Sequence, residues 1–166
     1  FRDGGVVFYI AATPTDLNGD GSLDTGLVCA VEDQSSGIQW YNGNHITTGA
    51  TATAIGAGAA NTATIITSQG ATQTDYAAGL AKAYNGGGFT DWFLPSKNEI
   101  NEMYQNELDI NATATSNGGD AFTVDFYWSS SELSAYSAWS QRFINNATSD
   151  DNKSKDSMKV RAIRAF

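Results

Sequence analysis

The chain has 166 residues, enough for one domain that buries about two-thirds of the surface exposed by its unfolded form. Hydrophobic residues make up 41% of it and aromatic residues 11%, which is the composition of a globular protein. The formal charge of −9 disfavours nucleic acid and anionic membrane surfaces as partners, and no apolar stretch approaches the roughly 18 residues of a membrane-spanning helix.

We expect a single domain over residues 1–166. The sequence opens at Phe1 with neither an initiator Met nor a signal peptide, which indicates a piece cut from a longer protein. The one cysteine, Cys29, lies in an apolar run, where a buried structural thiol is expected rather than a nucleophile.

The first part of the chain favours strands. Residues 4–12 and 26–31 are rich in β-branched and aromatic side chains, and a polar loop joins them. Residues 47–74 are mostly Thr, Ala, Gly and Ile, which predicts a low-complexity loop with at most one short strand at residues 65–67.

Two helices are predicted next. Residues 75–84 place apolar side chains on one helical face, and the glycine run at residues 86–88 ends that helix. A second helix begins at Ser96, because Ser96 and Glu99 have the spacing of a capping box.

Beyond Asn111 the sequence predicts loops and strands, with strands at residues 126–128, 138–144 and 160–166. Strands, then two helices, then further strands indicate an α+β fold rather than an alternating β/α one.

The polar loop between the first two strands contains the most distinctive motif. Asp16, Asn18, Asp20 and Asp24 supply oxygen atoms at positions 1, 3, 5 and 9 of a loop that has Gly21 at its sixth position. This spacing predicts a structural Ca²⁺ site, although an apolar residue stands where a bidentate Glu would complete such a loop. The alternative is an ordinary solvated turn between two strands.

No recognisable catalytic constellation is present in the sequence. His45 is the only histidine and lies in a polar segment, so we expect it at the surface or hydrogen-bonded rather than acting as a general base. Nucleophile elbow, phosphate-binding loop and zinc-ligand spacing are all missing. We therefore expect a protein that is not an enzyme; a carbohydrate-active enzyme stays open as an alternative, although no carboxylate pair points to one.

Four sequence phrases carry a resemblance to a known family. They are GGVVFYI at residues 4–10, DWFLPSKNEI at 91–100, YWSSSE at 127–132 and VRAIRAF at 160–166. Together they resemble the Lcl C-terminal-like domain family of bacterial and phage surface proteins.

The resemblance implies a C-type-lectin-like fold, with adjacent N- and C-terminal strands and a long, outward-facing loop region. The sugar-binding EPN, QPD and WND signatures of animal C-type lectins are absent, so "lectin" names only a fold here. The polar loop at residues 13–25 is longer than the usual hairpin of the family, and the calcium prediction has no support from the resemblance.

Residues 133–159 also resemble the variable region of diversity-generating retroelement proteins that share this fold. Mutagenesis by such elements rewrites adenines, above all in Asn codons, which can become codons for many residues but never for Trp, Gln, Lys, Glu or Met. This segment also contains residues that such mutagenesis cannot produce, which we call unreachable, such as Trp139, Gln141 and Lys153. Their presence fits a set of fixed positions between variable ones.

The reachable residues of the segment are the candidate ligand-binding residues. An ordinary solvated surface is the alternative, because Ser, Asn and Asp are common in any polar loop. The candidates are Leu133, Ser134, Tyr136, Ser137, Ser140, Arg142, Ile144, Asn145, Ser149, Asp150, Asp151, Ser154, Asp156 and Ser157.

Strand alternation makes a geometric prediction for this segment. Ser140, Arg142 and Ile144 should share one exposed face with Tyr136, above a buried Phe143 and Trp128. Tyr136 is the expected main anchor, since an exposed aromatic side chain loses little entropy on binding, and Arg142 is the next.

These features favour a ligand-binding module, an adhesin or receptor-binding domain, displayed on a bacterial or phage surface. The expected partner is a protein or glycan on a cell surface, because a rigid scaffold that presents Tyr, Ser, Asn and Asp resembles a paratope. The expected location is extracellular, on a cell surface or a virion. A structural or assembly domain of a fibre or pilus is the alternative.

Overall fold

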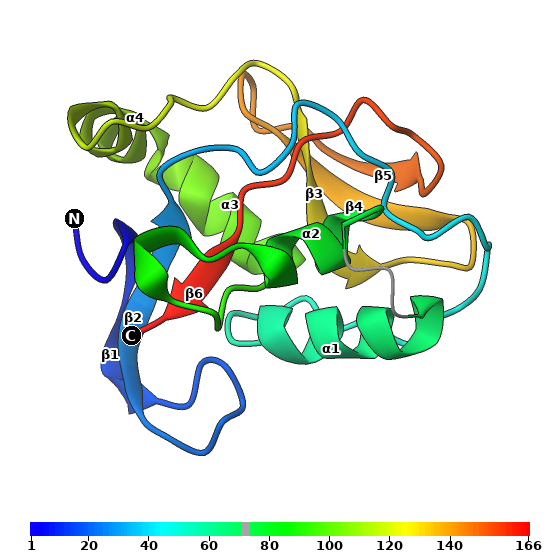
Figure 1. Ribbon diagram of the computed structural model, residues 1–166, viewed down its shortest axis with the longest axis horizontal. Helices are drawn as coiled ribbons and strands as arrows, with labels where there is room; N and C mark the ends of the chain where they lie inside the picture. The colour runs from blue at the N-terminus through cyan, green and yellow to red at the C-terminus, as the bar shows by residue number, and fades with distance from the viewer. Residues whose placement is uncertain (71–73) are drawn as a thin grey trace.

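The first and last strands of the chain lie in one antiparallel sheet in the computed structural model, which describes residues 1–70 and 74–166 (Figure 1). β1 (Gly5–Thr15) pairs with β2 (Asp24–Ala30), whose other edge pairs with β6 (Ile163–Ala165). β2 lies between two partners and is almost wholly buried, which suits its apolar sequence. The strands predicted at residues 4–12 and 26–31 are confirmed, and β6 is shorter than predicted.

A second antiparallel sheet has the order β3 (Phe126–Glu132), β4 (Ser137–Arg142), β5 (Thr148–Asn152). β3 and β4 confirm the predicted strands, with different bounds. β5 was not predicted because its sequence, TSDDN, contains poor strand formers; pairing with β4 across a short turn imposes the extended conformation.

The segment from Lys159 to Ala165 connects the two sheets. Its start forms a parallel bridge from Lys159 to Tyr127 of β3, and further along Ile163 forms an antiparallel bridge to Phe93. Amide–carbonyl hydrogen bonds of 2.8 and 2.9 Å join Phe93 and Ile163 in both directions. The C-terminal segment therefore contributes main-chain pairing to both halves of the fold.

In the described part of the chain, the first, third and fourth α-helices pack against the sheets, and the short second one packs mainly against the first (Figure 1). They are α1 (Gly58–Gln69), α2 (Ala77–Ala83), α3 (Lys97–Gln105) and α4 (Glu107–Ser116). α2 and α3 confirm the two predicted helices. The capping box of α3 is present as predicted: the Glu99 amide donates to Ser96 Oγ over 3.3 Å, and the Ser96 amide donates to the Glu99 carboxylate over 2.6 Å.

The expectation of a loop or short strand within residues 47–74 is wrong, because α1 occupies residues 58–69 of that stretch, including the predicted strand at 65–67; residues 71–73 of it lie outside the described residues. Weak helix formers such as Ile65 and Thr62 misled the prediction. Tertiary contacts outweigh their propensity: Ile65 is fully buried, and the Leu94 amide donates to the Thr62 hydroxyl over 3.0 Å.

The expectation of two helices is likewise incomplete, since α4 continues to Ser116 where loops were predicted. Its sequence has little hydrophobic periodicity. Only Ile110 and Ala114, one turn apart, are buried, so the pattern was too short to reveal the helix.

The core consists of two clusters of buried side chains. One is centred on Trp40, Trp92 and Trp128, and the other contains Leu27 and Cys29. Burial raises the pKa of the Cys29 thiol to about 12, so this group is a protonated structural thiol at neutral pH.

Candidate functional site

Twelve of the fourteen predicted ligand-binding residues are exposed or half-buried, and two are buried. The buried ones are Ser140 and Asp151, with exposed fractions of 2% and 5%. The predicted exposure of Ser140 is therefore wrong. The accessible candidates are Leu133, Ser134, Tyr136, Ser137, Arg142, Ile144, Asn145, Ser149, Asp150, Ser154, Asp156 and Ser157.

The burial of Ser140 has a simple cause. Ser140 pairs with Trp128 of β3, and Trp128 packs in a core cluster with Trp40 and Met158, so this face of the sheet is covered. The Ser140 hydroxyl donates to the Asp151 carboxylate over 2.6 Å. The two buried candidates thus form a polar contact between β4 and β5 and are not available to a ligand.

The residues that were expected to form a fixed, buried frame of this segment agree better with the structure. Trp128 and Phe143 are buried as predicted, and the unreachable Gln141 and Lys153 are fully buried. Trp139 is half-buried, and the Lys97 ammonium lies 3.3 Å from its ring centroid.

The accessible candidates do not form one continuous face. Tyr136 lies in the turn before β4, whereas Ile144 lies in the turn after it. β4 has six residues, so roughly 20 Å of strand separates the two turns. The prediction that Tyr136, Arg142 and Ile144 share one face is therefore wrong, and the structure places them in two separate patches.

The first patch is aromatic and joins two segments that are distant in sequence. We define the aromatic patch as Tyr41, His45 and Tyr136. The ring centroids of Tyr41 and His45 lie 4.6 Å apart, and those of His45 and Tyr136 lie 5.0 Å apart. Tyr136 is 63% exposed, and Leu133 in the same turn is 48% exposed. His45 is exposed as expected, but its sequence gave no sign of this contact.

A buried ion pair lies behind the aromatic patch. The Lys153 ammonium binds the Glu132 carboxylate, and both side chains have no exposed surface. The same ammonium donates to the Ile46 carbonyl over 3.0 Å and lies 4.4 Å from the ring centroid of Trp40. This pair ties the end of β5 to the loop that carries His45.

Glu132 adds two main-chain contacts. Its carboxylate accepts hydrogen bonds from the amides of Thr48 and Gly49 over 2.8 to 2.9 Å. Burial alone would raise the pKa of Glu132, but the hydrogen bonds from Lys153 and these amides outweigh it and lower the pKa. The Lys153 amide also donates to the Tyr136 carbonyl over 2.9 Å, so one buried pair holds both halves of the aromatic patch.

The second patch lies at the other end of β4. We define the Arg142 patch as Val124, Phe126, Arg142 and Ile144. The Arg142 guanidinium donates to the Val124 carbonyl over 3.2 Å and lies 5.4 Å from the Phe126 ring centroid. Val124 and Ile144 are 56% and 55% exposed. The patch combines a half-buried planar cation with exposed apolar surface.

The predicted calcium ligands are hydrogen-bonded within their own loop. The Asp16 carboxylate accepts from the amides of Gly19 and Gly21 over 2.6 and 3.0 Å. The Asp24 carboxylate accepts from the Leu17 amide over 2.8 Å and is almost buried. Burial is the main cause of the raised pKa of Asp24, and the charges of Asp20 and Asp16 add to it.

Calcium binding by Asp16, Asn18, Asp20 and Asp24 stays a prediction. Over residues 1–70 and 74–166, no three His, Cys, Asp or Glu side chains converge closely enough to hold a metal ion. If the loop nevertheless binds Ca²⁺, isothermal titration of chelator-treated protein will show heat, and the melting temperature will rise with Ca²⁺. Asp16→Asn should weaken both effects, whereas the exposed Asp109→Asn should change neither. A melting temperature unchanged at millimolar Ca²⁺ would rule the site out.

Comparison with known proteins adds one finding. Residues 29–164 match the model of the Lcl C-terminal domain family, a range that contains both patches but not the loop of predicted calcium ligands. No curated protein matches the chain. None of the helices in the described part of the chain is long and apolar enough to cross a bilayer.

Proposed function

The chain belongs to the Lcl C-terminal domain family, and from this premise we propose that it is a ligand-binding module displayed on a bacterial or phage surface. The aromatic patch is the observation that carries the proposal. Three neighbouring rings reach the surface there, and a buried ion pair holds the segments that present them. Preorganised aromatic side chains bind with a small loss of conformational entropy.

The proposed partner is a protein or glycan on a cell surface, and the proposed place of binding is extracellular. A net charge of −9 favours neutral or basic partners and opposes nucleic acid. On this proposal the domain binds its partner and performs no catalysis.

Two finer points belong to the same proposal. We infer a C-type-lectin-like fold, supported by the first and last strands sharing one sheet. The expectation that these two strands are adjacent is wrong, because β2 lies between them. We also infer that residues 133–157 form a diversified surface. Its support is that twelve of the fourteen reachable candidates are accessible while the unreachable Gln141 and Lys153 are buried. The buried Ser140 and Asp151 and the exposed Lys155 depart from this division.

The Arg142 patch favours a second candidate function. Val124 and Ile144 expose apolar surface next to Arg142, and such a surface suits contact with a neighbouring subunit of a fibre or pilus. An assembly domain would use this patch for packing rather than for recognising a variable ligand.

Replacing Tyr136 with Ala tests the first function. The free energy of unfolding should change by no more than about 0.5 kcal/mol, because the side chain is mostly exposed. Binding of labelled protein to intact bacterial cells, measured by flow cytometry, should weaken roughly thirtyfold if Tyr136 is a central anchor. His45→Ala should weaken it as well.

Leu108→Ala is the matched control, since Leu108 is 85% exposed on α4 and lies outside both patches. Equal cell binding by wild type and Tyr136→Ala would contradict the proposed site. Self-association in sedimentation experiments that is lost in Arg142→Ala, with no cell binding by wild type, would favour the assembly domain.

A further inference from the structure

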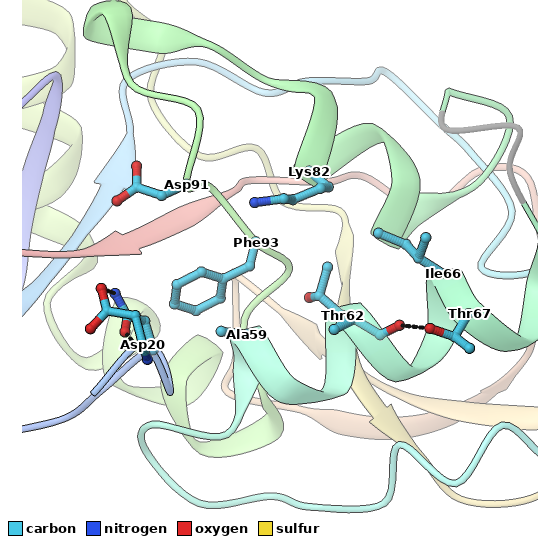
Figure 2. Close-up of a pocket in the computed structure, with 10 residues that line it drawn as sticks. Asp20, Ala59, Thr62, Ile66, Thr67, Lys82, Asp91 and Phe93 are labelled. Carbon is cyan, nitrogen blue, oxygen red and sulfur yellow. Dashed lines mark hydrogen bonds between the residues drawn. The ribbon is translucent and has the colours of Figure 1, made fainter. Parts of the chain in front are cut away.

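A pocket of about 490 Å³ lies between the loop that carries Asp20, helix α1, and Lys82 of α2 (Figure 2). Its volume falls within the range of small-molecule sites in proteins. None of its lining residues belongs to the aromatic patch or the Arg142 patch. The pocket is therefore a separate feature of the molecule.

The floor of the pocket consists of apolar side chains of α1 together with Thr62 and Thr67. Ala59, Ala63 and Ile66 lie at spacings of four and three residues, so they share one face of α1. Two of these side chains are methyl groups, which leaves space above the helix. The ring of Phe93 lies beside Ala59 and is only 2% exposed (Figure 2). The hydrocarbon part of a ligand placed on this floor would bury one side of its apolar surface, which favours binding.

A cation stands at one edge of this floor. Lys82 extends over the hollow above Phe93 in Figure 2, and its ammonium donates to the Thr90 carbonyl over 3.2 Å. The neighbouring Asp91 carboxylate is held by Arg164 through contacts of 2.7 and 2.8 Å. Lys82 forms an ion pair with no carboxylate in the described part of the chain.

A carboxylate stands at the opposite edge. The Asp20 carboxylate accepts from the Ser22 amide over 2.7 Å and from the Asn18 side-chain amide over 3.2 Å, which fixes its position. Within residues 1–70 and 74–166, no cation pairs with it. Leu17 anchors this loop, because it is 3% exposed and packs in the same core cluster as Phe93.

We propose that this pocket binds a small zwitterion with an apolar body, such as an ω-amino acid. The ligand ammonium forms an ion pair with Asp20, and the ligand carboxylate forms one with Lys82. The hydrocarbon chain of the ligand packs over Ala63 and Phe93. Exposed charges contribute little singly, so the two ends and the apolar contact must act together. This site is independent of cell-surface recognition by the aromatic patch.

Three probes that share a six-carbon body test the proposal: 6-aminohexanoate, hexylamine and hexanoate. Amide chemical shifts in NMR spectra recorded with a chelator present should move at pocket residues, most strongly with 6-aminohexanoate. Asp20→Asn should weaken the binding of 6-aminohexanoate and hexylamine about tenfold and leave the binding of hexanoate unchanged. Lys82→Met should weaken the binding of 6-aminohexanoate and hexanoate about tenfold and leave the binding of hexylamine unchanged. Ala63→Trp should block all three probes by filling the floor.

Asp109→Asn removes an exposed carboxylate from α4 and serves as the control, with affinities equal to wild type. If Ala63→Trp does not fold, Ala63→Leu provides a smaller obstruction. The proposal is overturned if no probe moves the pocket signals, if the zwitterion binds no better than hexylamine, or if Asp20→Asn and Lys82→Met bind like wild type.

Discussion

Lys153→Met is expected to lower the free energy of unfolding by about 3–5 kcal/mol. The variant leaves the Glu132 carboxylate buried without its cation, and it removes the hydrogen bond to the Ile46 carbonyl. Urea unfolding followed by fluorescence measures the loss. The variant should also release the loop that carries His45, so binding through the aromatic patch should fall even where the domain stays folded.

The matched control is Lys155→Met. Lys155 also pairs with a carboxylate, that of Asp151, but its own side chain is 51% exposed. That ion pair should contribute no more than about 1 kcal/mol. Adding Glu132→Gln to Lys153→Met removes the stranded charge and should recover part of the loss. Equal costs for the two lysine substitutions would contradict the role given to the buried pair.

Glu99→Ala is expected to cost about 3 kcal/mol of unfolding free energy. Glu99 is fully buried, and its carboxylate accepts from the amides of Ser96 and Gly56 over 2.6 and 2.8 Å. The variant leaves both amides without a partner and removes the capping box of α3. Thermal and urea unfolding should both report the loss, whereas Glu102→Ala on the same helix should change stability little.

Glu99 should also make stability depend on pH. Burial raises its pKa from 4.5 to about 7, although backbone amides oppose the shift, so the folded state holds this proton more tightly than the unfolded state. The corresponding stability is fully present below about pH 4.5 and is lost as the pH rises through 7, a change of roughly 3 kcal/mol.

Glu99→Gln cannot titrate at this position, so it isolates that change. The unfolding free energy of wild type relative to Glu99→Gln should therefore fall by roughly 3 kcal/mol as the pH rises from 4.5 to 8. Parallel pH profiles for the two proteins would show that the carboxyl group does not titrate as described.

Local signals in the sequence were enough to predict some elements. β-branched runs predicted β1 and β2, and the capping box at Ser96 predicted the start of α3 to the residue. Where tertiary contacts decide the conformation, the local signal failed. α1 depends on the burial of Ile65, and β5 depends on pairing with β4.

In the candidate site, too, local sequence predicted some features, and tertiary contacts decided others. Strand alternation correctly placed the side chains of Ser140 and Gln141 on opposite faces of β4. It could not show that other segments cover both faces at that point. The exposure of Tyr136 was predicted from its place among the reachable positions of residues 133–159. Its contact with His45 was not, because that contact depends on a buried pair between Glu132 and Lys153 that no local pattern encodes.

The pairing of β2 with β6 has a consequence for the order of folding. β2 finds its first partner, β1, across a nearby turn, but its second partner is a strand that follows more than a hundred residues later. Closing so large a loop is slow, and until it closes one edge of β2 offers unpaired amides and carbonyls to other chains. During synthesis the first sheet therefore stays incomplete and prone to aggregation until residues 163–165 have emerged, and only their arrival commits the domain to its native state.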